Sequence, residues 1–391
     1  MIVGIVAEYN PFHNGHKLQI DYAKNVLGAD AVIVAMSGSF TQRGEIACFD
    51  KYTRAEAALK CGADIILEIP TIFASSSARE FASAGVALLA STGVVDTILF
   101  GAECDNKDIF KESAKKLLEL ENSKEFNETV KSNVAAGDTY ATARAKFLEK
   151  YIPKEITSSP NNILGLEYCR YIFANNLNLN IEIIKRHFND YNSPDLTGSV
   201  SSATAIRSHL FNTGSIDAVP EKAEAVYQES VAAKPDDISE MLHYKLLTTE
   251  DFKDFLDCNK DLSERIKNNL DKYISFTQFC DLLKTKNVTY SKISRVLCHI
   301  LLDITYNDFA NAKNKGYISY MRMLGFSKAG ANLLSAIKEN GSCPLITAPT
   351  ELIDKYDIIS SNIYRAALTN KTSILYPSEY TRKFKLTNIE N

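Results

Sequence analysis

The protein has 391 residues, of which 45% are hydrophobic and 24% are charged, and its formal net charge is −4. This composition excludes a disordered or fibrous chain and is typical of a globular protein. The length allows two or three domains whose cores need no disulfide bridges or structural metals.

Short apolar runs rich in β-branched residues predict the strands of a parallel sheet that is buried on both faces. The runs lie at residues 2–7, 31–36, 64–69 and 97–100, and residues 180–185 (NIEIIK) are predicted to form a fifth strand. Apolar residues at helical spacing fill the intervals, at residues 16–27, 51–60 and 75–89. The alternation of strand and helix predicts right-handed crossovers and a Rossmann-like α/β fold, in which ligands bind at the carboxyl ends of the strands.

After the fourth strand the sequence becomes charged and mainly helical. Two of the expected helices lie at residues 161–175 and 202–211, and glycine and proline within residues 214–220 mark a boundary. We therefore predict an α/β domain over residues 1–215 and a mainly α-helical domain over residues 216–391.

The chain shows neither a secretory signal nor a membrane span. Its opening, MIVGIVAEYNPF, lacks a basic region and its apolar run is broken by Glu8. No uncharged apolar stretch approaches the roughly 18 residues that a membrane span needs. The eight cysteines are scattered without Cys-x-x-Cys spacing, so we expect reduced thiols, no metal site and a cytoplasmic protein.

Charge is distributed unevenly along the chain. Residues 1–220 hold 21 basic and 26 acidic residues, whereas residues 281–391 hold 15 basic and 9 acidic residues. The carboxyl-terminal third is therefore where a polyanionic partner is expected. A solvated surface with a chance excess of lysines is the alternative, and the charge count alone leaves it open.

The first predicted strand leads directly into a turn that carries two histidines. His13 and His16 lie three residues apart, before a helix and on the predicted ligand-binding edge. Gly15 between them lets the backbone approach a phosphate, and the amides of the helix favour anions. The two imidazoles can donate hydrogen bonds to phosphate oxygens while charge builds during displacement. A Walker lysine motif and a GxGxxG motif are both absent from the sequence, which excludes a P-loop enzyme and a dinucleotide-binding dehydrogenase.

This His-x-Gly-His segment resembles the signature of the HxGH nucleotidyltransferase superfamily, whose members join ATP to an acid or phosphate through an adenylate and release pyrophosphate. The resemblance implies a later motif with a basic residue near the phosphates. Ser201 and Ser202 ahead of a short helix, with Arg207 one turn inside it, fit that motif. It implies that His13, His16 and Arg207 are catalytic, although serines at a helix start are also common caps.

Longer segments resemble the tRNA(Met) cytidine acetate ligase family over essentially the full length. They include SGSFTQRGEIACFDKYTRAEAAL (37–59), GADIILEIP (62–70), YSKISRVLCHILLDI (290–304) and YMRMLGFSKAGANLL (320–334). The resemblance implies that ATP activates acetate to acetyl-adenylate. The acetyl group then passes to N4 of the wobble cytidine of elongator tRNA(Met), giving N4-acetylcytidine.

The resemblance also implies the ligands and their contacts. ATP is the expected substrate with Mg²⁺ bridging its phosphates, and tRNA(Met) and acetate are the partners, whereas neither a membrane nor a stable protein partner is implied. One member of the Asn161–Asn162 pair and one of the Arg186–His187 pair is expected at ATP. The other expected nucleotide contacts are Ser201, Ser202, Gly101, Ala7, Glu8, Tyr9, Asn10, Pro11, Phe12, His13, Asn14, Gly15, His16, Lys17, Leu18, Gln19 and Ile20.

Six basic residues of the carboxyl-terminal third are the candidates for holding tRNA: Lys292, Arg295, Lys313, Lys315, Arg322 and Lys328. Aromatic residues interleave the later ones, a pattern that suits a phosphate backbone with stacked bases. Without the family resemblance, a pair of surface helices with a solvated basic face is the preferred interpretation.

Two other functions compete with an RNA-modifying ligase. A small-molecule adenylyltransferase of coenzyme biosynthesis would share the histidine motif, but it has little use for a basic helical extension. A non-catalytic tRNA-binding protein on the same scaffold would not need both histidines and Arg207.

Overall fold

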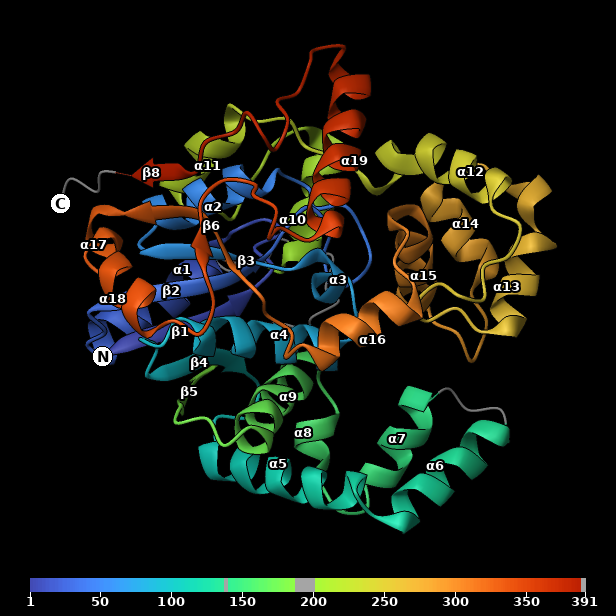
Figure 1. Ribbon diagram of the computed structural model, residues 1–391, viewed down its shortest axis with the longest axis horizontal. Coiled ribbons are helices and arrows are strands. Elements are labelled where there is room, and N and C mark those ends of the chain that lie inside the picture. The colour runs from blue at the N-terminus through green and yellow to red at the C-terminus, as the bar shows by residue number, and fades with distance from the viewer. Residues whose placement is uncertain (137–139, 187–200, 388–391) are drawn as a thin grey trace.

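The computed structural model describes residues 1–136, 140–186 and 201–387, and in these ranges eight strands form one mixed sheet at the centre of the molecule (Figure 1). Their order is β5-β4-β1-β2-β3-β6-β7, and β8 pairs with β6. The strands are β1 (Ile2–Ala7), β2 (Ala31–Ser37), β3 (Ile65–Ile69), β4 (Thr97–Ala102), β5 (Asn180–Lys185), β6 (Met321–Ser327), β7 (Leu345–Ile346) and β8 (Lys385–Thr387).

The five strands β1 to β5 run parallel, which confirms the strands predicted from the apolar runs. Alternate residues of a strand face opposite sides of a sheet, so each strand contributes to two cores. In β2, Val32 and Val34 lie in one buried cluster, while Ile33 and Ala35 lie in the other. Burial on both faces explains why β1 to β4 are largely apolar, whereas β5 (NIEIIK) alternates buried with less buried residues.

Helices cover both faces of the sheet. On one face α4 lies against β1 and β2 and α9 lies against β4, while on the other α2 lies against β3 and β6 with α11 behind it. The first helices are α1 (Asn14–Asp21), which continues as a π-helical turn (Tyr22–Val26), α2 (Lys51–Lys60), α3 (Thr71–Ala74), α4 (Ala78–Ser91), α5 (Lys107–Glu121), α6 (Lys124–Ala135), α7 (Tyr140–Leu148), α8 (Lys154–Thr157), α9 (Pro160–Ala174), α10 (Ala203–Thr213) and α11 (Glu221–Gln228).

The carboxyl-terminal part is largely helical, as predicted, and it also completes the sheet. Strand β6 pairs antiparallel with β3, and β7 and β8 pair with β6. The predicted boundary at residue 215 therefore does not coincide with the edge of the sheet. The helices of this part are two 3₁₀ turns (Pro235–Ile238 and Leu270–Lys272), α12 (Ser239–Thr248), α13 (Lys260–Lys267), α14 (Phe276–Leu283), α15 (Tyr290–Leu302), α16 (Tyr306–Asn314), α17 (Lys328–Ala331), α18 (Leu334–Asn340) and α19 (Lys355–Thr372).

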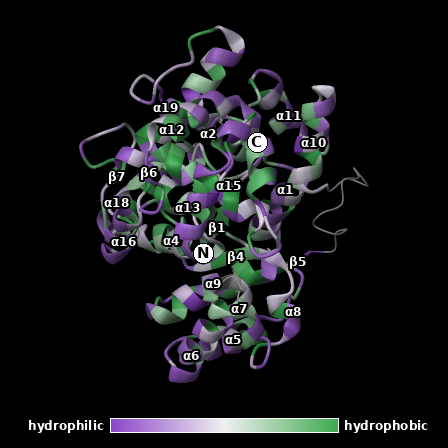
Figure 2. Cartoon of the chain, turned by 90° about the vertical axis from the view of Figure 1, so that its right-hand side faces the viewer, coloured by the Kyte–Doolittle hydropathy of each residue, from purple (hydrophilic) through white to green (hydrophobic). Residues whose placement is uncertain are grey.

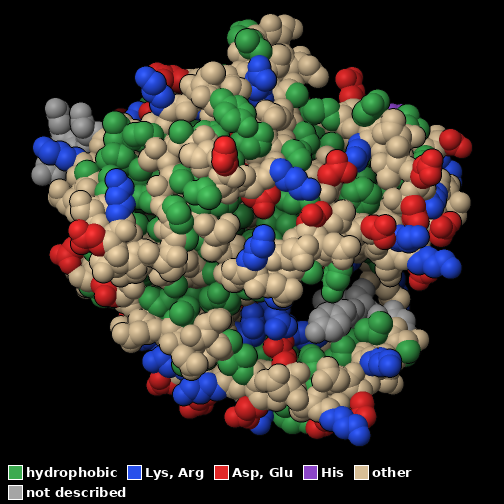
Figure 3. Space-filling view, in the orientation of Figure 1, with side chains coloured by type: hydrophobic (Ala, Val, Ile, Leu, Met, Phe, Trp, Pro, Cys, Tyr) green, Lys and Arg blue, Asp and Glu red, His purple; other side chains and the backbone are tan. Residues whose placement is uncertain are grey.

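Two helical groups extend from the sheet. Helices α5 to α8 form a lobe below it, and α12 to α15 form a group beside it (Figure 1). Figure 2 shows the same lobe projecting below α9, with hydrophilic residues on its outer helices. The surface is hollowed between this lobe and α16, and Lys and Arg side chains gather beside the hollow (Figure 3). Within the described ranges, none of the helices combines the length and the apolar character that a membrane crossing requires.

Candidate active site

A cavity opens at the carboxyl ends of β1 and β4, between the start of α1, the start of α10 and helix α9. This is the edge of a parallel sheet at which ligands are expected to bind. The cavity brings together predicted residues from five separate segments: Ala7, Glu8, Tyr9, Asn10, His13, His16, Gln19, Gly101, Asn161, Arg186, Ser202 and Arg207.

The two histidines are oriented by the backbone of their own turn. Nδ1 of His13 accepts a hydrogen bond from the Gly15 amide at 3.0 Å, and Nδ1 of His16 accepts one from the His13 amide at 3.2 Å. A ring nitrogen that accepts carries no proton, so each neutral ring carries its proton on Nε2. The rings stack with their centroids 3.8 Å apart. The turn therefore holds two Nε2–H donors side by side.

Both imidazoles are neutral at physiological pH. Burial, with the charges of Arg186 and Arg207, lowers the pKa of His13 to about 3. Burial, with His13 and Arg186, lowers the pKa of His16 well below its usual value of 6.5. Positive charge at the cavity therefore comes from the lining arginines Arg43, Arg186 and Arg207, while the histidines act as hydrogen-bond donors.

Arg207 and Arg186 reach the cavity from α10 and from the end of β5. Nη1 of Arg207 donates a 2.7 Å hydrogen bond to the carbonyl oxygen of Asn10, which ties the first turn of α10 to the histidine segment. Arg186 follows β5, and its stem lies over Gly101, where a Cβ atom would come within 3.4 Å of the Arg186 side chain. This distance corresponds to ordinary van der Waals contact, so the Arg186 stem packs over Gly101 beside the cavity.

Helices α1 and α10 both begin at this cavity, so the amides of two helix N-termini lie near it. His13 is the N-cap of α1, and Ser202 is the N-cap of α10, where its Oγ accepts a hydrogen bond from the Ala205 amide at 3.1 Å. Such termini favour negatively charged ligands. Ser202 is therefore a helix cap that also lines the cavity.

The structure distinguishes the members of the Asn161–Asn162 pair. Asn161 lines the cavity. Asn162 is buried, and its Oδ1 accepts the amides of Glu103 at 2.9 Å and Cys104 at 3.2 Å, which makes it a structural residue. In the second pair Arg186 lines the cavity, whereas His187 lies outside the described residues.

Several implied nucleotide contacts lie away from the cavity lining. Phe12 and Ile20 are fully buried in the core behind α1, and Lys17 forms an ion pair with Asp21 at 2.6 Å. Leu18 is exposed, and Gly15 contributes through its hydrogen bond to His13. The full set outside the lining is Pro11, Phe12, Asn14, Gly15, Lys17, Leu18, Ile20, Asn162 and Ser201.

Sequence reasoning assigned no role to the turn that follows β2, although Thr41, Gln42, Arg43 and Glu45 line the cavity. The Gln42 amide donates a 2.7 Å hydrogen bond to the Glu8 carboxylate, which joins this turn to the end of β1. Its position after a buried strand was the only local signal. Helix residues Phe81, Leu164 and Tyr168, with Phe100 of β4, supply an apolar wall that was also missed.

A buried arginine supports the same edge of the sheet. Arg54 of α2 donates hydrogen bonds to the carbonyl oxygens of Phe49 at 2.9 Å, Glu8 at 2.6 Å and Ser37 at 3.1 Å. It thereby holds the ends of β1 and β2 in fixed relation. Arg54 is a positioning residue because it reaches the site through backbone atoms only.

The residues predicted to hold tRNA fall into different environments. Lys292 pairs with Asp257 at 3.1 Å, and Arg295 lies 3.8 Å from the same carboxylate. Lys313 pairs with Glu80 at 2.8 Å. Lys315 is exposed. These four lie on or directly after α15 and α16, and their contact with tRNA stays a prediction.

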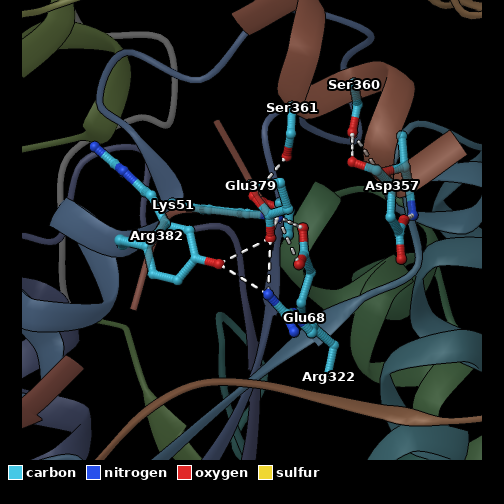
Figure 4. A network of polar contacts seen from close by, with 12 residues as sticks. Lys51, Glu68, Arg322, Asp357, Ser360, Ser361, Glu379 and Arg382 are labelled. Carbon is cyan, nitrogen blue, oxygen red and sulfur yellow. Dashed lines mark hydrogen bonds and ion pairs between the residues drawn. The ribbon is translucent and has the colours of Figure 1, made fainter. Parts of the chain in front are cut away.

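The prediction is wrong for Arg322, because its side chain is fully buried. Arg322 contacts Glu379 at 3.0 Å and the Tyr52 hydroxyl at 3.1 Å, within a buried network that also contains Lys51 and Glu68 (Figure 4). The Arg322 guanidinium binds Glu379 and so anchors the carboxyl-terminal segment to the sheet. Because it is buried, it does not face a phosphate backbone.

Lys328 is exposed, and its contact with tRNA stays a prediction. It follows β6, whose antiparallel pairing sets Phe326 beside Ile65 at the start of β3. The cavity lies at the carboxyl ends of the parallel strands, so Lys328 lies at the amino ends of these strands, away from the cavity. Helix α17, which begins at Lys328, is labelled in Figure 1.

The described residues contain no group of three or more His, Cys, Asp or Glu side chains that could hold a metal ion. Two carboxylates, Glu8 and Glu45, line the cavity. Mg²⁺ prefers oxygen ligands and commonly binds through substrate phosphates, one or two carboxylates and water.

These features define a nucleotidyltransferase of the HxGH class: a parallel sheet, paired histidines after β1, and Arg207 one turn into α10. Comparisons agree, since the family model described as HIGH Nucleotidyl Transferase matches residues 1–378. Similar proteins narrow this class to one family, since they are named tRNA(Met) cytidine acetate ligase. The chain belongs to that family.

Two relatives of that name illustrate the similarity. The protein from Clostridium perfringens (strain ATCC 13124) is 32% identical over 383 residues, covering 93% of this chain and 94% of the relative. The protein from Halothermothrix orenii is 34% identical over 419 residues, covering 98% and 96%. The crystal structure of Thermotoga maritima TmcAL bound with alpha-thio ATP has a TM-score of 0.87 and 26% identity, covering 99% of both chains.

Proposed function

We propose that this protein activates acetate with ATP and transfers the acetyl group to N4 of the wobble cytidine of elongator tRNA(Met). The observation that carries the proposal is the pair of neutral Nε2–H donors of His13 and His16, flanked by Arg186 and Arg207. The names of the relatives supply the acid, the base and the RNA.

In the first step, a carboxylate oxygen of acetate attacks the α-phosphorus of ATP. The bond from that phosphorus to the bridging oxygen of the β-phosphate breaks, and pyrophosphate leaves. His13 and His16 hydrogen-bond the α-phosphate oxygens, where charge develops, and Arg186 and Arg207 hold the departing pyrophosphate. Positioned donors of this kind lower the barrier because they need no reorganisation during the reaction.

The nucleotide lies across the carboxyl edge of the sheet in this proposal. Gly101 and Asn161 bound the cavity on the side of β4 and α9, and the amino ends of α1 and α10 face the phosphates. Mg²⁺ would be held mainly by the phosphate oxygens of ATP and by water, and it would neutralise charge on the phosphates.

In the second step, the weakly basic N4 amine attacks the carbonyl carbon of acetyl-adenylate. The wobble base lies in a single-stranded loop, so it turns outward at lower cost than a base in a duplex. We assign nucleotide chemistry to residues 1–215 and tRNA contact mainly to residues 216–391, with Lys292, Arg295, Lys313 and Lys315 as the basic contacts. Affinity for tRNA then falls as salt rises.

The test separates the two steps. Acetate-dependent exchange of labelled pyrophosphate into ATP reports adenylate formation, and transfer of label from acetate to tRNA(Met) reports the second step. Both are expected. Exchange with another acid and none with acetate would redirect the assignment to a coenzyme adenylyltransferase. Specific tRNA binding without any exchange would indicate a non-catalytic protein.

A further inference from the structure

The transfer step releases a proton from N4 of the cytidine, so a base is needed at the cavity. The lining arginines stay protonated, and His13 and His16 are weak bases because their pKa values are depressed. Burial raises the pKa values of Tyr9 and Tyr168, which keeps both hydroxyls protonated. Among the described residues of the lining, the remaining proton acceptors are the carboxylates of Glu8 and Glu45.

Glu8 is already engaged in the architecture of the site. Its Oε1 accepts the 2.7 Å hydrogen bond from the Gln42 amide, and its carbonyl oxygen accepts the Arg54 hydrogen bond at 2.6 Å. These contacts hold the turn after β2 against the end of β1. The Gln42 amide thus occupies one oxygen of the Glu8 carboxylate, which gives this side chain a structural role at the site.

Glu45 lies at the far end of that turn, which is closed by a 3.0 Å hydrogen bond from the Thr41 amide to the Glu45 carbonyl. The turn lies directly on helix α15, since a Cβ atom at Gly44 would come within 2.5 Å of the Arg295 backbone. Glu45 therefore stands between the nucleotide cavity on one side and the helical group on the other.

The surroundings of Glu45 come from both parts of the molecule. The charged and titratable groups that face its carboxylate are Arg43 on its own turn, Arg207 on α10, Glu8 after β1, Cys280 on α14 and Tyr290 on α15. Burial raises the pKa of the Glu45 carboxyl above its usual value, against the opposing charges of Arg207 and Arg43. A base is most effective when its pKa approaches the operating pH.

We propose that Glu45 is the general base of acetyl transfer, and that its carboxylate also recognises the amino group of the cytidine. Carboxylates accept hydrogen bonds from cytosine N4, a group that uracil lacks. As the bond from N4 to the carbonyl carbon forms, the bond from that carbon to the phosphate oxygen of AMP breaks. The N4 proton passes to Glu45, and AMP leaves with the electron pair. This assignment rests on the proposed function.

The experiment compares wild type with Glu45→Gln, which keeps the size of the side chain and removes the base. Chemically prepared acetyl-adenylate and tRNA(Met) isolate the transfer step in single-turnover measurements. Transfer is expected to slow by about 10²-fold to 10⁴-fold, the range typical of a lost general base. The loss in acetate-dependent pyrophosphate exchange should be at least about 10-fold smaller than the loss in transfer.

A pH profile and two further variants complete the design. Wild-type transfer should rise with pH through one inflection, which Glu45→Gln abolishes and Glu45→Asp retains with partial rate. Glu229→Gln removes an exposed carboxylate and serves as the matched control. Equal losses in exchange and transfer, or an unchanged pH profile, would overturn the role of Glu45. Absence of exchange in wild type would instead refute the proposed function.

Discussion

The imidazole rings of His13 and His16 are stacked with their centroids 3.8 Å apart, and the backbone amide of His13 donates a hydrogen bond to Nδ1 of His16. Replacing His16 by Ala removes one Nε2–H donor from the cavity. Pyrophosphate exchange should fall by about 10²-fold to 10³-fold, which is the usual cost of losing one such donor. His243→Ala is the control, because His243 stacks on Tyr273 in the helical group. Near-normal exchange in His16→Ala would remove the histidine from the chemistry.

The low pKa of His13 predicts the pH dependence of stability. Its ring stays neutral in the folded state down to about pH 3, whereas an unfolded histidine takes up a proton near pH 6.5. The unfolded state therefore binds more protons between these values, and stability falls as the pH falls below 6.5 by roughly 1.4 kcal/mol per unit for this residue. Urea unfolding of His13→Gln should show a weaker loss between pH 6.5 and 4.5. A parallel loss in both proteins would contradict the shift.

Arg186 is one cause of that low pKa, so its removal provides an independent test. In Arg186→Gln the pKa of His13 should move up toward its usual value, which NMR titration of the ring measures directly. Exchange should also weaken, because the departing pyrophosphate loses a positive partner. An unshifted His13 titration would show that Arg186 does not contribute and that burial and Arg207 lower the pKa.

Asn161 and Asn162 should respond in opposite ways to replacement by Ala. Asn161→Ala should raise the KM for ATP with little change in stability, since the side chain lines the cavity. Asn162→Ala removes the side-chain oxygen that accepts the amides of Glu103 and Cys104. A hydrogen bond contributes about 0.5–1.5 kcal/mol, so the free energy of unfolding should drop by about 1–3 kcal/mol for the two bonds. Urea unfolding and ATP-dependent kinetics on both variants decide the assignment.

The buried network around Glu379 should be essential for stability (Figure 4). Burial raises the pKa of Glu379, but Lys51, Tyr52 and Arg322 together lower it to about 2. Glu379→Gln leaves Lys51 and Arg322 without that charge, and breaking a buried pair typically costs about 3–5 kcal/mol. The exposed pair of Lys124 and Glu128 is the control, where Glu128→Gln should change stability by less than about 1 kcal/mol. Equal effects in urea unfolding would mean that the network contributes no more than a surface pair.

The parts of the fold that can be predicted are those encoded by local pattern. β1 and β2 are continuous apolar runs, and α2 carries its own helical spacing between Asp50 and a terminal glycine. Strand β6 could not be predicted from local pattern because Arg322 and Gly325 interrupt its apolar sequence. The burial of Arg322 depends on Glu379, which lies 57 residues further along the chain.

The same distinction applies to the candidate site. His13, Gly15 and His16 belong to a single turn, so their spacing alone identifies them. Glu45 reaches the cavity because its turn is bound to Glu8 across 34 residues and rests on α15. Such a placement depends on tertiary contacts that no local motif records.

The antiparallel pairing of β6 with β3 has a consequence for synthesis. While the ribosome is still making the chain, β1 to β5 are complete long before β6 and β8 emerge, so the backbone of β3 presents an open edge to solvent. Open edges recruit foreign strands. The nascent protein is therefore most exposed to aggregation late in translation, and truncation of the chain before β6 would leave the edge of β3 open.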